Sequence, residues 1–184
     1  MALAGPASAD SIFFDGVTFS AVYNANVLTI EIDAAGRSGG WANAVTMDTI
    51  QVKNVGSFSS VSMTGPNGSW IYHPNELNAM GCDGGSNGGQ RACFSTPVPG
   101  VALSDDMIFT FTYVGGVQDF DETHLKVRFL DAGGFKIGSL LSDDLVASAS
   151  PIPEPETYAL MLAGLGLLGF TLRRRKQQEQ KAAA

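Results

Sequence analysis

Residues 107–114 read MIFTFTYV, and this stretch decides how the chain is expected to fold. Met107, Phe109, Phe111 and Tyr113 occupy every second position, and threonine or aliphatic side chains lie between them. Successive side chains of a β-strand point to opposite faces of a sheet, so a period of two places the four large side chains on one face. The stretch therefore predicts a β-strand with one face buried in a core.

The same alternation of apolar and polar side chains recurs in residues 26–33 and 123–130. Further strands are predicted near residues 11–23, 45–52, 58–63, 69–72, 135–138 and 140–147. The segments between them are rich in glycine and asparagine, which turns require. No window of ten or more residues before Pro151 has helical periodicity. The sequence predicts an all-β domain over residues 10–149, an antiparallel β-sandwich of jelly-roll or immunoglobulin-like type.

A hairpin is predicted within this domain. Residues 124–141 read HLKVRFLDAGGFKIGSLL, in which an alternating strand is followed by the turn sequence Asp-Ala-Gly-Gly and a second apolar run. Turn residues between two strand-like runs favour antiparallel pairing of those runs. We therefore expect residues 135–138 to return alongside residues 124–130.

The C-terminal stretch has a different composition. Residues 151–176 read PIPEPETYALMLAGLGLLGFTLRRRK. Its three parts are the triplet Pro153, Glu154 and Pro155, the apolar run 157–172, and the cations Arg173, Arg174, Arg175 and Lys176. Proline interrupts helices and strands, so residues 150–156 are expected to form an extended junction. The uncharged run would make a helix of roughly 24 Å, slightly shorter than the roughly 30 Å hydrocarbon core of a bilayer.

We expect residues 157–172 to form a single transmembrane helix and residues 173–184 a basic cytoplasmic tail, because cations flanking a membrane segment favour the cytoplasmic side. The alternative is a buried core helix. Such a helix would carry charged or strongly polar residues along one face, and this run carries no charged residue.

The order of Pro-Glu-Pro, apolar run and arginine cluster resembles the PEP-CTERM sorting signal of Gram-negative bacteria. The resemblance implies recognition by an exosortase, a membrane-embedded cysteine-type protease or transpeptidase. It also implies a precursor held in the inner membrane with its domain in the periplasm. After processing, the protein would reach the cell surface or the extracellular polysaccharide matrix.

The first residues are consistent with export. Residues 1–9 read MALAGPASA, and Ala7-Ser8-Ala9 has the small-residue form of a signal peptidase site. We interpret residues 1–9 as the remnant of a signal peptide, with Asp10 as the first mature residue. An ordinary chain terminus is the alternative.

Cys82 and Cys93 flank a glycine-rich loop and are the two cysteines of the chain. Two thiols at this spacing in an exported chain predict a disulfide. A metal site would need two further ligands, and neither His73 nor His124 lies at a recognisable spacing. No metal site is therefore predicted at the cysteines.

Asp119, Asp121 and Glu122 lie close together in a predicted loop. Calcium prefers carboxylate oxygens, so these residues are a candidate calcium site, although they lack the Asp-x-Asp-x-Asp-Gly pattern of an EF-hand. Solvated turn carboxylates are the alternative interpretation.

Three aromatic residues are candidates for stacking against sugar rings: Trp41, Trp70 and Tyr72. Trp70 and Tyr72 would share one face of a short strand. The alternative is that all three simply fill the core of the sandwich.

Charge and motif content limit the function further. The chain has 11 Lys and Arg against 18 Asp and Glu, a net charge of −7, which argues against nucleic-acid binding because phosphate contacts need a basic surface. It has no Gly-x-Ser-x-Gly, His-Glu-x-x-His, phosphate-loop or dinucleotide signature, so no catalytic residues and no cofactor are predicted.

Two function classes follow. The first is a non-enzymatic exported protein of the surface or biofilm matrix, with exopolysaccharide as a further partner; the second is a carbohydrate-binding or carbohydrate-degrading module that uses the same export route.

Overall fold

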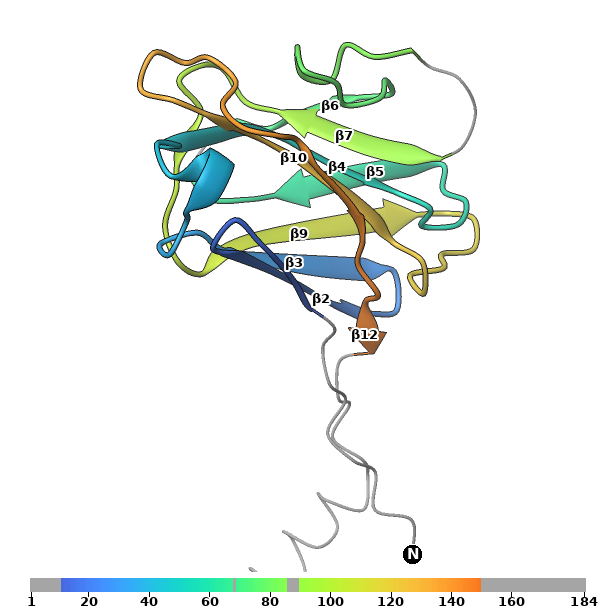
Figure 1. Cartoon of the computed structure of the whole chain (residues 1–184). Helices are drawn as coiled ribbons and strands as arrows, with labels where there is room; N and C mark the ends of the chain where they lie inside the picture. Colours follow the sequence, from blue (N-terminus) through green and yellow to red (C-terminus); the bar gives the residue numbers. More distant parts are fainter. Residues whose placement is uncertain (1–10, 68, 86–89, 150–184) are drawn as a thin grey trace, which may run out of the picture. The chain divides into compact units, whose positions relative to one another are not determined.

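The computed structural model describes residues 11–67, 69–85 and 90–149, which form two six-stranded sheets (Figure 1). Sheet A has the order β1 (Ser11–Phe14), β2 (Val17–Asn24), β3 (Val27–Asp33), β9 (Met107–Val114) and β5 (Ser60–Thr64), with β12 (Ser148–Ala149) also paired to β2. Sheet B has the order β11 (Leu141–Asp144), β10 (His124–Leu130), β4 (Thr46–Lys53), β7 (Arg91–Ser95) and β6 (Ile71–His73), with β8 (Val101–Ala102) also paired to β4. Every named pairing is antiparallel except that of β12 with β2. The prediction of an all-β fold with antiparallel sheets is confirmed.

One hydrophobic core lies between the two sheets and takes side chains from both. Phe94 of β7 meets Phe111 of β9 with ring centroids 5.8 Å apart. Trp41, at the end of the 3₁₀ turn Gly39–Trp41, packs edge-on against Phe19 of sheet A and Phe129 of sheet B at 6.1 and 4.6 Å. These ring contacts across the core join the two sheets.

The period-two alternation correctly identified the buried faces. Met107, Phe109, Phe111 and Tyr113 of β9 are all buried, while the residues between them are exposed or half-buried. The same is true of β3 and β10, where every second residue is buried in the core. Burial of one face per strand is what the sequence pattern required.

The region 11–23, predicted as strand, is a hairpin. Phe14 pairs with Val17, so Asp15 and Gly16 form a two-residue turn, and both have positive φ, of 46° and 75°. An Asp-Gly pair with positive φ at both positions is the preferred turn for joining two twisted antiparallel strands. The turn divides the region into β1 and β2.

Residues 135–138 turn back beside the end of β10 as expected, but the prediction that they form a strand is wrong. Asp131 Oδ1 accepts hydrogen bonds from the Gly133 and Phe135 amides at 2.9 and 3.0 Å, which closes the expected turn. After it, the pairing is limited to the bridge of Leu130 with Lys136, in which the Asp131 amide donates to the Phe135 carbonyl at 2.9 Å and the Ile137 amide to the Phe129 carbonyl at 3.0 Å. The first half of β10, residues 124–127, pairs with β11 instead. Gly138 in this segment has a positive φ of 65°, which a regular strand does not adopt. Strands β7, β8 and β12 were not predicted.

The described domain begins and ends at the same sheet edge. Ser11 of β1 is paired with Ser20, and Ser148 of β12 with Val22, both on β2 (Figure 1). In the part of the chain that the structure describes, no helix is long and apolar enough to cross a membrane. The signal-peptide remnant, the junction, the transmembrane helix and the tail were predicted over residues 1–9, 150–156, 157–172 and 173–184, and all four lie outside the described residues.

Candidate functional site

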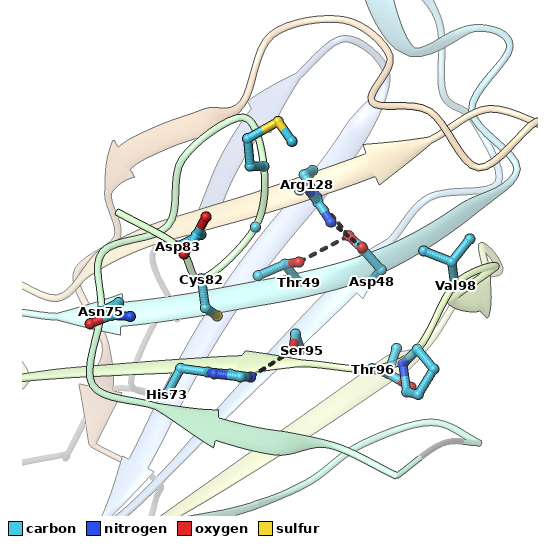
Figure 2. Close-up of a pocket in the computed structure, with 13 residues that line it drawn as sticks. Asp48, Thr49, His73, Asn75, Cys82, Asp83, Ser95, Thr96, Val98 and Arg128 are labelled. Atoms are coloured by element: carbon cyan, nitrogen blue, oxygen red, sulfur yellow. Dashed lines mark hydrogen bonds and ion pairs between the residues drawn. The ribbon is translucent and has the colours of Figure 1, made fainter. Parts of the chain in front are cut away.

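A cavity of about 390 Å³ opens on the outer face of sheet B (Figure 2). Four strands contribute to it: Thr49 from β4, His73 from β6, Ser95 from β7 and Arg128 from β10. The remaining lining residues are Asp48, Asn75, Met80, Gly81, Cys82, Asp83, Thr96, Pro97 and Val98. Polar side chains therefore cover most of the strands beneath the cavity, and loops supply its walls.

A β-bulge in β4 brings Asp48 to this face. Arg128 is paired with Thr49 but the next residue, Phe129, is paired with Met47, so Asp48 is the extra residue of the pairing. Strict alternation would have placed Asp48 on the core face with Ile50. A bulge adds one residue to one strand and redirects its side chain. The bulge thus keeps a carboxylate out of the core and turns it towards the cavity.

Asp48 and Arg128 form a buried ion pair beneath the cavity. Arg128 Nε donates to Asp48 Oδ1 at 2.8 Å, and Arg128 Nη2 donates to Asp48 Oδ2. Thr49 Oγ1 donates to Asp48 Oδ1 at 2.9 Å, and Arg128 Nη1 donates to the Ala79 carbonyl at 3.0 Å. The side chains are 3% and 12% exposed, so the two charges neutralise each other away from water. Two parallel N–H···O bonds also fix the orientation of the guanidinium.

One wall of the cavity belongs to residues 74–85, here called the covering loop. Its Cys82 is bonded to Cys93 of β7, which confirms the disulfide prediction. Gln51 of β4 holds the loop backbone from below, donating to the Asn75 carbonyl at 3.2 Å and accepting from the Leu77 amide at 3.1 Å. Gly81, with φ of 111°, lies so close that a Cβ there would be 3.3 Å from Arg128 Nη2. The loop therefore lies directly on the sheet.

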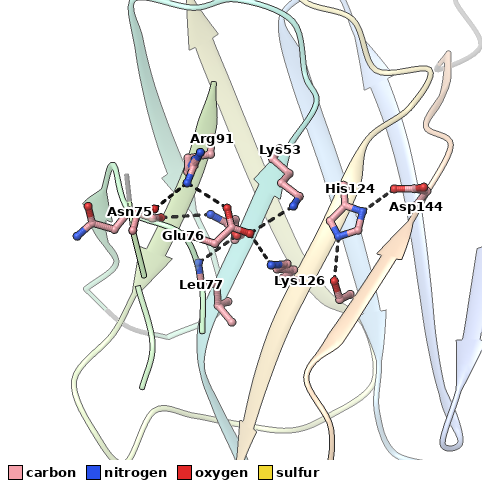
Figure 3. A network of polar contacts seen from close by, with 11 residues as sticks. Lys53, Asn75, Glu76, Leu77, Arg91, His124, Lys126 and Asp144 are labelled. Carbon is pink, nitrogen blue, oxygen red and sulfur yellow. Dashed lines mark hydrogen bonds and ion pairs between the residues drawn. The ribbon is translucent and has the colours of Figure 1, made fainter. Parts of the chain in front are cut away.

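Glu76 anchors the covering loop by charge (Figure 3). Its carboxylate meets Lys53 Nζ at 3.3 Å, Arg91 Nη1 at 3.1 Å and the ammonium of Lys126. Burial alone would raise the pKa of Glu76, but the hydrogen bonds and charges of Lys126 and Lys53 outweigh it, so the pKa lies below its usual value. Three cations from three neighbouring strands thus hold a single loop carboxylate.

The opposite wall of the cavity is formed by the segment that comes directly after β7 in the chain. The Thr96 amide donates to the Asp48 carbonyl at 2.9 Å, so the bulge also positions the start of this segment. Gly100, with φ of 85°, approaches so closely that a Cβ would be 2.4 Å from the Met47 carbonyl oxygen. Any residue with a side chain would push this segment away from β4.

Several polar groups at the cavity are available to a ligand. His73 Nε2 and Ser95 Oγ are hydrogen-bonded to each other at 2.9 Å. The Asn75 side chain is half-buried, the Asp83 side chain is exposed, and both line the cavity without a hydrogen bond to the described residues. Met80 and Val98, 76% and 62% exposed, add apolar surface at the opening.

A second polar group lies on the same face of sheet B, outside the cavity. His124 Nδ1 contacts Asp144 Oδ1 at 2.5 Å and His124 Nε2 contacts Ser142 Oγ at 3.0 Å (Figure 3). The connectivity matches a Ser-His-Asp triad, but Asp144 is 70% exposed and none of the three residues lines the cavity. In catalytic triads the acid is buried and an oxyanion site lies beside the serine. We interpret this group as the polar link between β10 and the edge strand β11.

The three aromatic candidates do not form one platform. Trp41 is fully buried between the sheets, so its prediction as a sugar-stacking residue is wrong. Trp70 packs edge-on against Phe109 at 5.4 Å and donates through Nε1 to the Pro66 carbonyl at 3.3 Å. Tyr72 remains 42% exposed beside Phe94. Core packing, the alternative interpretation, accounts for Trp41 and in large part for Trp70.

The acidic candidates Asp119, Asp121 and Glu122 are exposed, and the Asp121 amide donates to Asp119 Oδ1 at 3.1 Å, as in a turn. Among the described residues, no group of three or more His, Cys, Asp or Glu side chains is arranged to hold a metal ion. The structure therefore gives the calcium prediction no support. A different acidic pair interacts: the hydrogen bond with Asp105 raises the pKa of Asp33.

Comparison with known protein families matched residues 151–176 to the PEP-CTERM protein-sorting motif. The chain carries a PEP-CTERM sorting motif. The matched span contains both the Pro153-Glu154-Pro155 triplet and the cations 173–176, so the resemblance seen in the sequence is confirmed. The PEP-CTERM motif marks an exported protein and is the signal that an exosortase processes. A search of curated proteins gave no match to the chain.

The PEP-CTERM motif was found from sequence, whereas the cavity was not. The strand residues that line the cavity come from β4, β6, β7 and β10, and β7 was not predicted at all. One signal was present: Asp48 occupies a core-facing position of an otherwise alternating strand. A carboxylate at such a position indicates either a bulge or a buried partner.

Proposed function

We propose that the chain is a non-enzymatic exported protein that an exosortase processes in the inner membrane and that then joins the cell surface or the extracellular polysaccharide or biofilm matrix. The PEP-CTERM motif at residues 151–176 carries this proposal. In the precursor, Arg173 to Lys176 remain on the cytoplasmic side and the β-domain lies in the periplasm. Pro-Glu-Pro is then close to the outer face of the membrane, where a processing enzyme reaches an extended peptide.

The folded domain supports a location outside the cytoplasm. The Cys82–Cys93 disulfide is typical of an oxidising compartment such as the periplasm. The covering loop depends on that covalent bond and on ion pairs rather than on extensive apolar packing, since its apolar cluster consists of Leu77 and the two cysteines, with Leu140 packed against them. A domain with such an anchor suits a compartment in which the disulfide persists.

We also infer that the sandwich is of the jelly-roll type. The antiparallel pairs β4–β10, β5–β9 and β6–β7 are nested in the sequence, and they fall alternately in sheets B, A and B. A long hairpin folded over into two sheets produces this nesting. The role in the matrix is then structural, with the double sheet as a compact unit.

Replacing Pro153-Glu154-Pro155 with three alanines tests the sorting proposal. Blots of membrane and extracellular fractions, using a tag placed after Asp10, are expected to show the variant retained at full length in the membrane. The matched control replaces Gln177, Gln178 and Glu179 with alanine, because these residues lie just beyond the matched span. The control should mature and leave the membrane normally.

The sorting proposal fails if the Pro-Glu-Pro variant matures and leaves the cell at the same rate as the control. It also fails if deletion of the exosortase gene leaves the processing of the unmodified protein unchanged. Retention of both variants would mean that residues 177–179 are also needed for release, so that the effect is not specific to the triplet.

A further inference from the structure

We propose that the cavity on sheet B binds a neutral saccharide of one or two rings. The saccharide would lie between the polar strands beneath the cavity and the apolar side chains at the opening of the cavity. This goes beyond export, since it concerns the folded domain and holds whether or not the chain is processed. It also places sugar recognition away from the aromatic residues that the sequence suggested.

The charges around the cavity favour a neutral ligand. Arg128 is the only cation among its lining residues, and Asp48 neutralises it through two hydrogen bonds while the Ala79 carbonyl takes a third. An anionic ligand would therefore find no uncompensated positive charge and would meet the Asp83 carboxylate instead. Lys53, Arg91 and Lys126 of sheet B are engaged by Glu76 and are not among the lining residues.

A divalent cation is not a suitable occupant either. Asp48 is engaged by Arg128 and Thr49, which leaves Asp83 as the lining carboxylate that has no partner among the described residues. One carboxylate is too few for a calcium site, which takes six to eight oxygen ligands.

The polar groups match a ligand rich in hydroxyls. Asn75 offers both an acceptor oxygen and two N–H donors, and the His73–Ser95 pair offers a hydroxyl beside an imidazole. Each hydroxyl of a sugar donates one hydrogen bond and accepts others, so it needs mixed donors and acceptors rather than a single charge. The side chains come from β6, β7 and the covering loop, and so they surround the space from more than one side (Figure 2).

The opening supplies the complementary apolar surface. Met80 of the covering loop and Val98 after β7 are both highly exposed, and both line the cavity. Exposed large apolar side chains beside convergent polar groups are typical of ligand sites. The C–H face of a sugar ring can pack against them. A volume of about 390 Å³ lies at the small end of the roughly 300–1,000 Å³ range of ligand pockets, which fits one or two rings.

The test uses the full-length protein, produced in a host without an exosortase and purified in a detergent that has no sugar headgroup. Isothermal titration calorimetry is performed with glucose, galactose, mannose, cellobiose and maltose, and with inorganic phosphate as the anionic comparison. At least one neutral sugar is expected to bind at millimolar concentration or below, and more tightly than phosphate.

Two variants at the cavity and two controls locate the site. Asn75→Ala removes the half-buried amide and Met80→Ala truncates an exposed side chain, so neither disturbs the core; each should weaken binding, Asn75→Ala by about tenfold. Asn43→Ala and Val117→Ala are the matched controls, because both residues are exposed and neither lines the cavity. The controls should bind like the unmodified protein.

Three results would overturn the inference: no sugar of the panel binds, phosphate binds more tightly than every sugar, or the cavity variants bind no more weakly than the controls. None of these results bears on processing, which the Pro-Glu-Pro variant tests separately. Binding that all four variants weaken equally would also exclude the cavity as the site.

Discussion

Arg128→Met removes the guanidinium that neutralises Asp48 while keeping an unbranched side chain of similar length. Asp48, 3% exposed, would keep the Thr49 hydroxyl as its side-chain partner in the structure. Removing one member of a buried ion pair typically costs about 3–5 kcal/mol, because the other charge is left without compensation. We expect the free energy of unfolding to fall by about 3 kcal/mol, the lower end of this range, because the Arg128 side chain is itself 12% exposed.

The reverse change, Asp48→Val, leaves the Arg128 guanidinium with the Ala79 carbonyl and should cost a similar amount. The double variant replaces both charges with apolar groups and leaves no buried charge unpaired. Such replacements are often close to neutral. The double variant should therefore lose no more stability than either single variant, which corresponds to a coupling energy of at least about 3 kcal/mol.

Denaturant unfolding followed by tryptophan fluorescence measures these free energies, since Trp41 is fully buried and reports on the core. Lys136→Met is the control, because the Lys136 side chain is exposed and its ammonium donates to the Gly138 carbonyl of the same loop, and it should stay within about 0.5 kcal/mol of the unmodified protein. The reasoning is refuted if the two single effects add in the double variant. Additivity would mean that the two charges do not depend on each other.

Two further predictions concern the anchors of the covering loop. Replacing both Cys82 and Cys93 with serine opens the loop that the disulfide closes, which has a sequence separation of 11, and should lower the free energy of unfolding by about 3 kcal/mol. Denaturant unfolding of the variant and of the unmodified protein, both without reductant, measures this difference. Equal denaturation midpoints for the two proteins would contradict the prediction. The pKa of Glu76 is lowered on folding, so its contribution is present above the unfolded value near 4.5 and is lost as pH falls through the folded value. The melting temperature should therefore fall less steeply between pH 7 and pH 3 for Glu76→Gln than for the unmodified protein. Parallel curves of melting temperature against pH would show that the ion pairs of Glu76 with the three cations contribute nothing to stability.

The strands were predictable where burial alone determines the pattern. In β9 and β3 one face is fully apolar and buried, so a period of two identified the strand and the face together. The disulfide was predictable because two cysteines allow a single pairing. The sorting motif was predictable because its parts are contiguous in the sequence.

The cavity was not predictable, because its geometry depends on pairings between distant residues. Arg128 follows its partner Asp48 by 80 positions, and Lys126 follows Glu76 by 50. Polar residues on a strand face look the same in sequence whether they meet water or a loop. The bulge at Asp48 is equally hidden, because it exists only relative to the register of β10.

The covering loop explains why an exposed sheet face carries so many anchored polar groups. The outer face of an antiparallel sheet is usually solvated, and its charged side chains then contribute little to stability. Here Glu76, Gln51 and the disulfide fix a loop over that face, so the charges of β4, β7 and β10 become partly buried structural contacts. The cavity is the space that remains between this loop and the segment after β7. Its shape therefore depends on anchors that are ionic and covalent, and loosening either one should weaken sugar binding before the apolar core between the two sheets is affected.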